Sequence, residues 1–585
     1  MDYVARPMEI QSVGIGQKED VVRRLFCGNS TSHCGYGCQS GPCLEESLLK
    51  LPRLSWFSAQ RISGTFRIVG RSGVPPMIAA LALNSRVIFA DKVENYTEIT
   101  FEDGRYAYST EYDPMTDTLV SLRYKTNAFC SGGTFLADGR ILSVGGNGPL
   151  KWLDPTVDDG FRGIRYLDRR FDDDRLDGAY WYEPGYTLST PRWYPSTQTL
   201  EDGRIFVASG SLNGDDPSVA ENNNPTYELL DRDGSPYGDS IELSILERNQ
   251  PYYMYPFLHL LRDGTLFIFV SKSAEIFDVD SGITVKTLPD LPGDYRTYPN
   301  SGGSVLLPLR SSNGWEPEVM ICGGGAFQSL DSPTDPSCGR IRPLSDNAKW
   351  KMEAMPGGRI MGEGILLPDG RVLWINGCST GAQGYGVAKD PILTPWIYRP
   401  RAPLKNRWAI GGSSTIPRMY HSVALLLLDG TVLVAGSNPI EQPLLVTNPD
   451  VPELAFPTEF RVEIYTPHYL MGGNADRRPQ KVSLSKRYLV ADSSTFTLKF
   501  VADGENKKLD IVLYHGGYVT HSVHMGHRML YLDHQGWKPF KRKQKITVTM
   551  PPSSRIAPPG PYVIYVVVDG IPSVGQFVMV QNGNE

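Results

Sequence analysis

The chain has 585 residues, of which 41% are hydrophobic and 21% charged, enough for one large globular domain and a smaller one. A net charge of −6 and a pI near 5.9 give no support for binding to nucleic acid or anionic membranes, and no apolar run is long enough to cross a bilayer. Abundant Gly, Pro and Tyr with little helical periodicity predict an all-β chain with many turns.

The first feature along the chain is a cluster of four cysteines at positions 27, 34, 38 and 43. Their spacing predicts a small disulfide framework in an oxidising, extracellular compartment. Glycosylation sequons at Asn29 and Asn95 agree with secretion, whereas residues 1–26 show no signal peptide. The stretch "FCGNSTSHCGYGCQSGPC" resembles the second half of a hevein-like chitin-binding domain, without that family's upstream cysteines. We expect residues 1–50 to be a partial chitin-binding segment, either disordered or an incorrect N-terminus, with at most a weak chitin contact.

Seven copies of one pattern follow, in which a turn leads into an apolar strand. The clear copies are "ADGRILSVGG", "EDGRIFVASG", "RDGTLFIFVS", "PDGRVLWING" and "LDGTVLVAGS", and the weaker ones are "LNSRVIFAD" and "EPEVMICGGG". The residues just before these strands are Arg86, Arg140, Arg204, Thr265, Glu318, Arg371 and Thr431. Their separations of 53 to 64 residues predict a seven-bladed β-propeller of the kelch type, with Asp-Gly at the tight hairpin turns.

After about residue 457 this pattern stops, and short strands such as "TFTLKF" and "YVIYVVVDG" follow. They predict an immunoglobulin-like β-sandwich at the C-terminus. We expect the propeller at residues 55–456 and the sandwich at residues 457–585. Three of the scattered cysteines, Cys322, Cys338 and Cys378, leave their pairing open, because three is an odd number.

Alignment of the repeats brings reactive side chains to one shared position. Ten residues before the aligned residue lie Cys130 in the second copy, Tyr194 in the third and His421 in the seventh. Tyr420 is one step before His421. Equivalent positions in different blades are related by rotation about the propeller axis, so these residues are expected to form a ring around it.

The same position in the fourth and sixth copies is Tyr255 and Met361, which we expect to line a substrate pocket at the same mouth. A packing role stays open for every member of the ring. Aromatic residues stabilise protein cores, and a buried Cys behaves as a small hydrophobic residue. Spacing alone therefore leaves a metal site and a packed core as alternatives.

From about residue 60 to 581 the chain resembles the copper radical oxidases, the family of galactose oxidase and glyoxal oxidase. The resemblance rests on "TNAFCSGGTFLADGRILSVGG", "TPRWYPSTQTLEDGRIFVASGS", "PRMYHSVALLLLDGTVLVAGSNP" and "YVTHSVHMGHRML", which occur in this order. It implies a thioether bond between Cys130 and Tyr194. It also implies one copper ion, whose ligands would be Tyr194, Tyr420, His421 and His521, the last reaching into the propeller from the sandwich.

The same resemblance implies a two-electron oxidation of the substrate. Tyr194, linked to the sulfur of Cys130, would hold a radical, and Tyr420 would take the substrate's hydroxyl proton as general base. Dioxygen would leave as hydrogen peroxide. Imidazole and phenolate are ligands that suit Cu(II). His524 is the alternative to His521 as the last ligand.

The substrate is indicated by weaker signals. "KVENYTEI" and "YAYSTEYD" are closer to the glyoxal oxidase branch of the family. Galactose oxidases place a Trp over the thioether where this chain has Leu212, and the local sequence "YMYPFLHLL" lacks the Arg with which they grip the sugar. We expect oxidation of small aldehydes, as hydrates, to carboxylic acids, with primary alcohols as the alternative. Trp152, Phe161 or Tyr166 is expected to shield the radical in place of the missing Trp.

A different class of function is a non-catalytic kelch module that binds a protein partner. It explains the repeats but leaves the reactive ring as a coincidence. We expect instead a secreted monomeric enzyme whose partners are a small aldehyde or alcohol and O2. A peroxidase is the expected user of the peroxide, and neither nucleic acid nor a membrane is an expected partner.

Overall fold

The computed structural model describes residues 60–171, 173, 178, 180–503 and 507–582. The cysteine cluster, Asn29 and the hevein-like stretch lie outside these residues. The regular secondary structure of the described part is almost entirely β-strand, with one short α-helix, α3 (Ser244–Glu247), and none of its helices is long and apolar enough to span a membrane. The described 3-10 helices are η2 (Ala220–Asn222), η3 (Ser311–Asn313), η4 (Leu404–Asn406), η5 (Pro452–Leu454), η6 (His468–Leu470) and η7 (Asn474–Arg477).

Seven sheets follow one another and form the blades of a β-propeller, as the repeats predict. The first three blades contain β3 (Ile78–Leu81), β4 (Val87–Ala90), β5 (Ser109–Asp113) and β6 (Thr118–Leu122); β7 (Gly132–Phe135), β8 (Ile141–Val144) and β9 (Ile164–Leu167); β10 (Ser196–Thr199), β11 (Ile205–Ala208), β12 (Thr226–Leu230) and β13 (Pro236–Glu242). The fourth and fifth contain β14 (Phe257–Leu260), β15 (Leu266–Val270), β16 (Ser273–Asp278) and β17 (Ile283–Leu288); β18 (Gly303–Leu306), β20 (Val319–Cys322), β21 (Ser337–Ile341) and β22 (Lys351–Ala354). The sixth contains β23 (Glu363–Leu366), β24 (Val372–Ile375), β27 (Trp396–Tyr398), β28 (Trp408–Ile410) and β1 (Gln60–Arg61), and the small pair β25 (Cys378–Gly381) and β26 (Ala388–Pro391) lies between its strands in sequence.

The first strand of each blade lies nearest the axis. β10 contacts β7 and β14, and β29 (Ser422–Leu426) contacts β23 and β3, so the first strands touch one another around a ring. Burial is complete along five of these first strands, β7, β10, β14, β23 and β29. It explains why their sequences consist largely of apolar or small residues.

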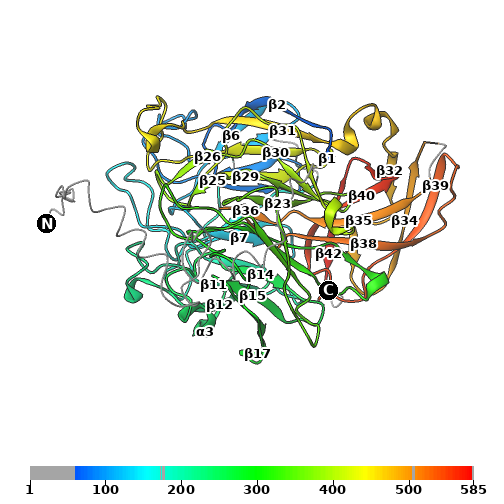
Figure 1. Cartoon of the computed structure of the whole chain (residues 1–585), viewed down its shortest axis with the longest axis horizontal. Helices are drawn as coiled ribbons and strands as arrows, with labels where there is room; N and C mark the ends of the chain where they lie inside the picture. Colours follow the sequence, from blue (N-terminus) through cyan, green and yellow to red (C-terminus); the bar gives the residue numbers. More distant parts are fainter. Residues whose placement is uncertain (1–59, 172, 174–177, 179, 504–506, 583–585) are drawn as a thin grey trace, which may run out of the picture. The chain divides into compact units, whose positions relative to one another are not determined.

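The seventh blade closes the propeller by joining both ends of the repeat region. Its strands are β29, β30 (Val432–Gly436) and β31 (Arg461–Pro467), and its outer strand is β2 (Gly64–Arg71), which pairs antiparallel with β31. In Figure 1 the blue β2 lies beside the yellow β31. This pairing holds the ring shut across nearly 400 residues of chain, so it depends on the complete fold.

The C-terminal strands form one connected set, as expected for the sandwich. They are β32 (Gln480–Leu484), β33 (Tyr488–Val490), β34 (Thr495–Val501), β35 (Leu509–His515), β38 (Arg528–Gln535), β39 (Lys543–Thr549), β40 (Gly560–Val568), β41 (Ile571–Pro572) and β42 (Gln576–Gln581), with β19 (Leu309–Arg310) added from the propeller. A boundary between the two parts at residues 456 and 457 stays a prediction. The strand β31 follows this boundary in sequence but belongs to the seventh blade.

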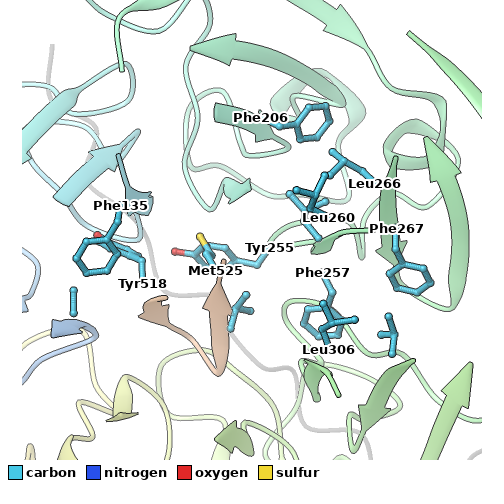
Figure 2. Packing of buried hydrophobic residues seen from close by; sticks show 14 of the residues in the cluster. Phe135, Phe206, Tyr255, Phe257, Leu260, Leu266, Phe267, Leu306, Tyr518 and Met525 are labelled. Carbon is cyan, nitrogen blue, oxygen red and sulfur yellow. The ribbon is translucent and has the colours of Figure 1, made fainter. Parts of the chain in front are cut away.

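A hairpin from the C-terminal part enters the propeller. β36 (Tyr518–Thr520) and β37 (Val523–Met525) pair with each other, and β36 pairs with β3 of the first blade. The hairpin also contacts the first strands β7, β10, β14, β18 and β29. Figure 2 shows Tyr518 and Met525 of this hairpin among the propeller residues Phe135, Tyr255 and Phe257. The turn of the hairpin therefore sits at the centre of the ring of blades.

The cysteine pairing that the sequence left open is resolved by strand register. Cys322 on β20 lies opposite Cys338 on β21, and the two form a disulfide. Among the described residues Cys130 and Cys378 are free and buried. Asn95 is exposed, as a glycosylation site requires, and its backbone amide donates to Gln442.

Candidate metal centre

The predicted ring positions share one unusual backbone conformation. The φ angles of Cys130, Tyr194, Tyr255, Met361 and His421 are 55°, 68°, 47°, 57° and 59°. Bulky side chains rarely adopt left-handed backbone, and each such residue costs about 1–3 kcal/mol. Each of the five stands one or two residues before the first strand of its blade. The count of ten residues therefore found equivalent positions in five blades.

Cys130 is the entry residue of the second blade and is fully buried. Its Sγ is 3.4 Å from Nε2 of His521, and its carbonyl accepts a hydrogen bond from the Tyr194 amide at 3.1 Å. Burial raises the pKa of the Cys130 thiol well above its ordinary value, and the side chain of Tyr194 acts in the opposite direction. The thiol thus lies protonated beside the tyrosine with which the resemblance pairs it.

Two buried tyrosine hydroxyls meet next to this thiol. The oxygens of Tyr194 and Tyr420 are 3.1 Å apart, and the Tyr194 hydroxyl donates to Tyr298 Oη at 3.1 Å. Burial raises the pKa of Tyr194 and of Tyr420 well above the ordinary value. A buried phenol ionises when a cation lies beside it, so these two oxygens are suited to a position next to a metal ion.

Two histidines complete the group. The rings of His421 and His521 are 4.8 Å apart, and the ring of Tyr420 stacks on His421 at 3.8 Å. His521 stands at the turn of the β36–β37 hairpin with a φ of 48°, and its Nδ1 is 2.6 Å from Thr520 Oγ1. Burial lowers the pKa of His421 well below its ordinary value and that of His521 to about 3. Both imidazoles are therefore neutral, the form that binds metals.

These donors fit a copper ion. Neither ring nitrogen of His421 has a hydrogen-bond partner although the residue is buried, which is costly unless something else occupies that position. The ligand atoms of Cys130, His421 and His521 all lie within 4.8 Å of one another. Neutral imidazoles with two phenol oxygens are the mixed nitrogen and oxygen set that Cu(II) favours.

The rings that cover Tyr194 differ from those expected. Tyr298 stacks on it with centroids 4.2 Å apart, and Trp193 packs against it at 4.4 Å. The expectation of shielding by Trp152 or Tyr166 is wrong, because Trp152 is 73% exposed and Tyr166 stacks on another tyrosine, Tyr182.

Phe161, the third residue expected to shield the radical, makes no ring contact with Tyr194 among the described residues. Trp193 directly precedes Tyr194 in the motif "PRWYPST", so the sequence held this signal. Tyr298 had no such signal, because it does not stand ten residues before the aligned residue of its blade.

The remaining predicted residues lie around the centre in different ways. Tyr255 packs edge-on against Tyr194 at 5.1 Å and donates its hydroxyl to the Ser131 carbonyl, while Met361 is buried in the same apolar cluster. Their role as substrate-pocket residues stays a prediction. His524, the alternative ligand, instead lies 3.1 Å from a Glu363 carboxylate oxygen.

A buried charged network, which the sequence analysis missed, supports the segment that carries Tyr420 and His421. Lys92 forms an ion pair with Glu94, which also accepts a hydrogen bond from the Asn438 side chain. The Asn438 amide donates to the Tyr420 carbonyl at 2.9 Å. The first blade thus holds the ligand-bearing loop of the seventh.

Comparisons with known proteins agree with the fold. A family model described as "Glyoxal oxidase N-terminus" matches residues 85–469, and one described as "Galactose oxidase-like, Early set domain" matches residues 478–580. A solved structure titled as a fungal alcohol oxidase in complex with copper superposes with a TM-score of 0.69, covering 88% of this chain and 99% of its own. Its identity of 20% supports the fold alone.

Curated relatives cover most of the chain. Aldehyde oxidase GLOX of Vitis pseudoreticulata is 35% identical over 490 residues, which span 81% of this chain and 86% of the relative. Aldehyde oxidase GLOX1 of Arabidopsis thaliana is 31% identical over 496 residues, which span 81% and 75%. Galactose oxidase of Gibberella zeae is 24% identical over 510 residues, which span 82% and 65%. The chain therefore belongs to the glyoxal oxidase family, a group of copper radical oxidases.

Proposed function

We propose that the chain is a copper-dependent aldehyde oxidase, which converts small aldehydes, as their hydrates, into carboxylic acids. Each turnover removes two electrons and two protons from the hydrate and transfers them to O2, which becomes H2O2. The observation that carries the proposal is one buried convergence of a thiol, two phenol oxygens and two neutral imidazoles. They belong to Cys130, Tyr194, Tyr420, His421 and His521.

Tyr194, Tyr420, His421 and His521 are the residues that would hold copper, which would supply one-electron redox chemistry at this place. Aldehyde oxidation removes two electrons, so a second electron store is needed. The ring of Tyr194, once bonded to the sulfur of Cys130, would be that store. Forming this bond breaks one S–H and one ring C–H, and the two hydrogens leave with O2 as H2O2.

Two residues of the chain would act directly on the substrate, one by proton transfer and one by hydrogen-atom transfer. Tyr420 Oη would take the proton of the substrate hydroxyl, because its ring lies against His421 at 3.8 Å and a cation held there would favour its phenolate form. Tyr194 would take the hydrogen atom from the substrate carbon. The rings of Tyr298 and Trp193, which pack against Tyr194, exclude water from it and so protect an oxidised ring from side reactions.

Aldehydes are preferred over alcohols on two grounds. The relatives above 30% identity in these comparisons include two that carry the name aldehyde oxidase, and residues 253–261 offer no Arg to grip a sugar. Primary alcohols are the second candidate, favoured by the match to galactose oxidase of Gibberella zeae.

The test is peroxide release from the copper-loaded full chain with glyoxal, methylglyoxal, primary alcohols and galactose. We expect turnover with the small aldehydes, abolished in Cys130→Ser and Tyr194→Phe. Cys378→Ser is the matched control, because Cys378 is the other free buried cysteine among the described residues and stands outside the group of donors. Turnover of normal rate in both Cys130→Ser and Tyr194→Phe would refute the radical assignment, and turnover with alcohols only would move the chain to the second candidate.

We further propose an extracellular, monomeric enzyme whose peroxide is consumed by a peroxidase. The Cys322–Cys338 disulfide supports an oxidising compartment. A weak chitin contact through residues 1–50 stays a prediction, as do glycosylation at Asn29 and Asn95.

A further inference from the structure

A second group of buried histidines lies along the same hairpin, outside the proposed copper centre. Its members are His259 on β14, His515 at the end of β35, His524 on β37 and His527 just before β38. None of them is needed by the proposed mechanism. Two of them, His524 and His527, have rings only 5.1 Å apart.

His524 has one ring nitrogen held and one free. Its Nε2 is 3.1 Å from Glu363 Oε2, which also accepts from the Ala424 amide, while Glu363 Oε1 accepts from Asn376. A carboxylate can only accept, so Nε2 carries the proton and Nδ1 keeps its lone pair. His524 Nδ1 is buried and has no partner. A carboxylate that orients one nitrogen and leaves the other free is the usual support of a metal-binding histidine.

His527 likewise has a partner at one ring nitrogen only, and its Nδ1 can bind a metal in the tautomer whose Nε2–H donates to that partner. Its Nε2 lies 3.2 Å from the Tyr514 hydroxyl, and its Nδ1 is buried without a partner. Burial lowers the pKa of His527 well below its ordinary value, and the neighbouring histidines act in the same direction. The imidazole is therefore neutral, and a neutral imidazole is a metal ligand.

The spacing of the two rings is the third observation. Two imidazoles bound to one tetrahedral ion through bonds of about 2.0–2.1 Å have ring centres roughly 5 Å apart. The observed 5.1 Å matches this value, with the ring planes tilted by 39°. A cavity of about 10 Å³, lined by His259, His524 and Ser304 but not by His527, gives room for about one water molecule on the His524 side.

We propose that His524 and His527 form a second transition-metal site, in which their Nδ1 atoms bind one imidazole-seeking ion and solvent fills the other positions. Copper and zinc share the chemistry that this site would recognise. The site stands independently of the oxidase proposal, because it uses none of the residues of the copper centre. Since only two protein atoms bind, it is expected to release its ion to a chelator before the copper centre does.

The test counts metal on the full chain after gel filtration, with Cu²⁺ and Zn²⁺ supplied in separate arms. We expect His421→Gln/His524→Gln to retain one equivalent less than His421→Gln, whatever the weakened copper centre still holds. His534→Gln is the matched control, because His534 also has one nitrogen on a carbonyl and a free Nδ1, and no imidazole ring is packed against it in the described structure. Loss of the ion when His534→Gln is added to His421→Gln would overturn the site. So would equal numbers of bound metal ions in His421→Gln and His421→Gln/His524→Gln.

A second measurement needs no metal count. A ligand that binds only the folded state raises the unfolding temperature. Zn²⁺ should raise it by more in His421→Gln than in His421→Gln/His524→Gln or His421→Gln/His527→Gln. No shift in His421→Gln, or an equal shift in all three variants, would show that the proposal is wrong.

Discussion

Replacement of Tyr298 by Phe tests whether this residue tunes the oxidation of Tyr194. In the structure the Tyr194 hydroxyl donates to Tyr298 Oη at 3.1 Å, and the two rings stack at 4.2 Å. Once Tyr194 is a phenolate it has no proton to donate, so the Tyr298 hydroxyl would turn and donate to it. Tyr298→Phe removes this hydrogen bond and leaves the stacked ring in place.

The size of the effect follows from the charge on the acceptor. A hydrogen bond to a charged group contributes about 1.5–3 kcal/mol. It stabilises the phenolate more than the neutral radical, so its loss should lower the one-electron potential of Tyr194 by about 60–130 mV. Tyr298→Leu also removes the aromatic contact with Tyr194, whose interaction energy is about 0.5–1.5 kcal/mol.

The assay is a redox titration of the copper-loaded chain, with the radical followed by electron paramagnetic resonance and optical absorption. Trp193→Phe is the matched control, because it changes the other ring packed on Tyr194 without removing a hydrogen bond to its oxygen. An unchanged or raised potential in Tyr298→Phe would refute this reasoning, whatever happens to turnover.

Three further predictions concern mass, stability and pH. After reduction of disulfides such as Cys322–Cys338, copper-treated wild type and Cys378→Ser should each lack two hydrogens by intact mass relative to the unlinked chain, whereas Cys130→Ser should lack none. Replacing Cys322 and Cys338 by Ser should destabilise the chain by about 3 kcal/mol in urea unfolding, since the disulfide closes a loop of 16 residues. Burial raises the pKa of Asp91 to about 7, so its contribution to the free energy of unfolding is most favourable below pH 4 and is lost as pH rises towards 8. The stability of Asp91→Asn relative to wild type should therefore be higher at pH 8 than at pH 5. A missing mass difference in wild type, an unchanged midpoint without the disulfide, or an Asp91→Asn effect that is the same at both pH values would contradict these predictions in turn.

The count of ten residues back from the aligned position worked in the blades whose hairpins have the same length, and failed in the fifth blade, whose hairpin is longer. Cys130, Tyr194 and His421 were found because each stands ten residues before the residue that precedes the second strand of a short hairpin. In the fifth blade the hairpin between β18 and β20 carries β19 and η3, so the same count ends at Pro308, past the first strand. Tyr298, which packs on Tyr194, stands five residues before β18 and not one or two, so it does not occupy the repeated position and no such count would have found it.

By itself the sequence determined the number of blades, the sandwich after them and the residues of the ring, because turn chemistry and strand spacing are local. Only the tertiary structure decided which side chains meet across blades: the Glu94 support under the Tyr420–His421 segment, the Cys322–Cys338 pair and the placement of His521 beside Cys130. Those contacts join residues 16 to nearly 400 positions apart, and no local pattern encodes them. They form because closing the ring of blades around an inserted hairpin buries these groups together, and buried polar groups require partners.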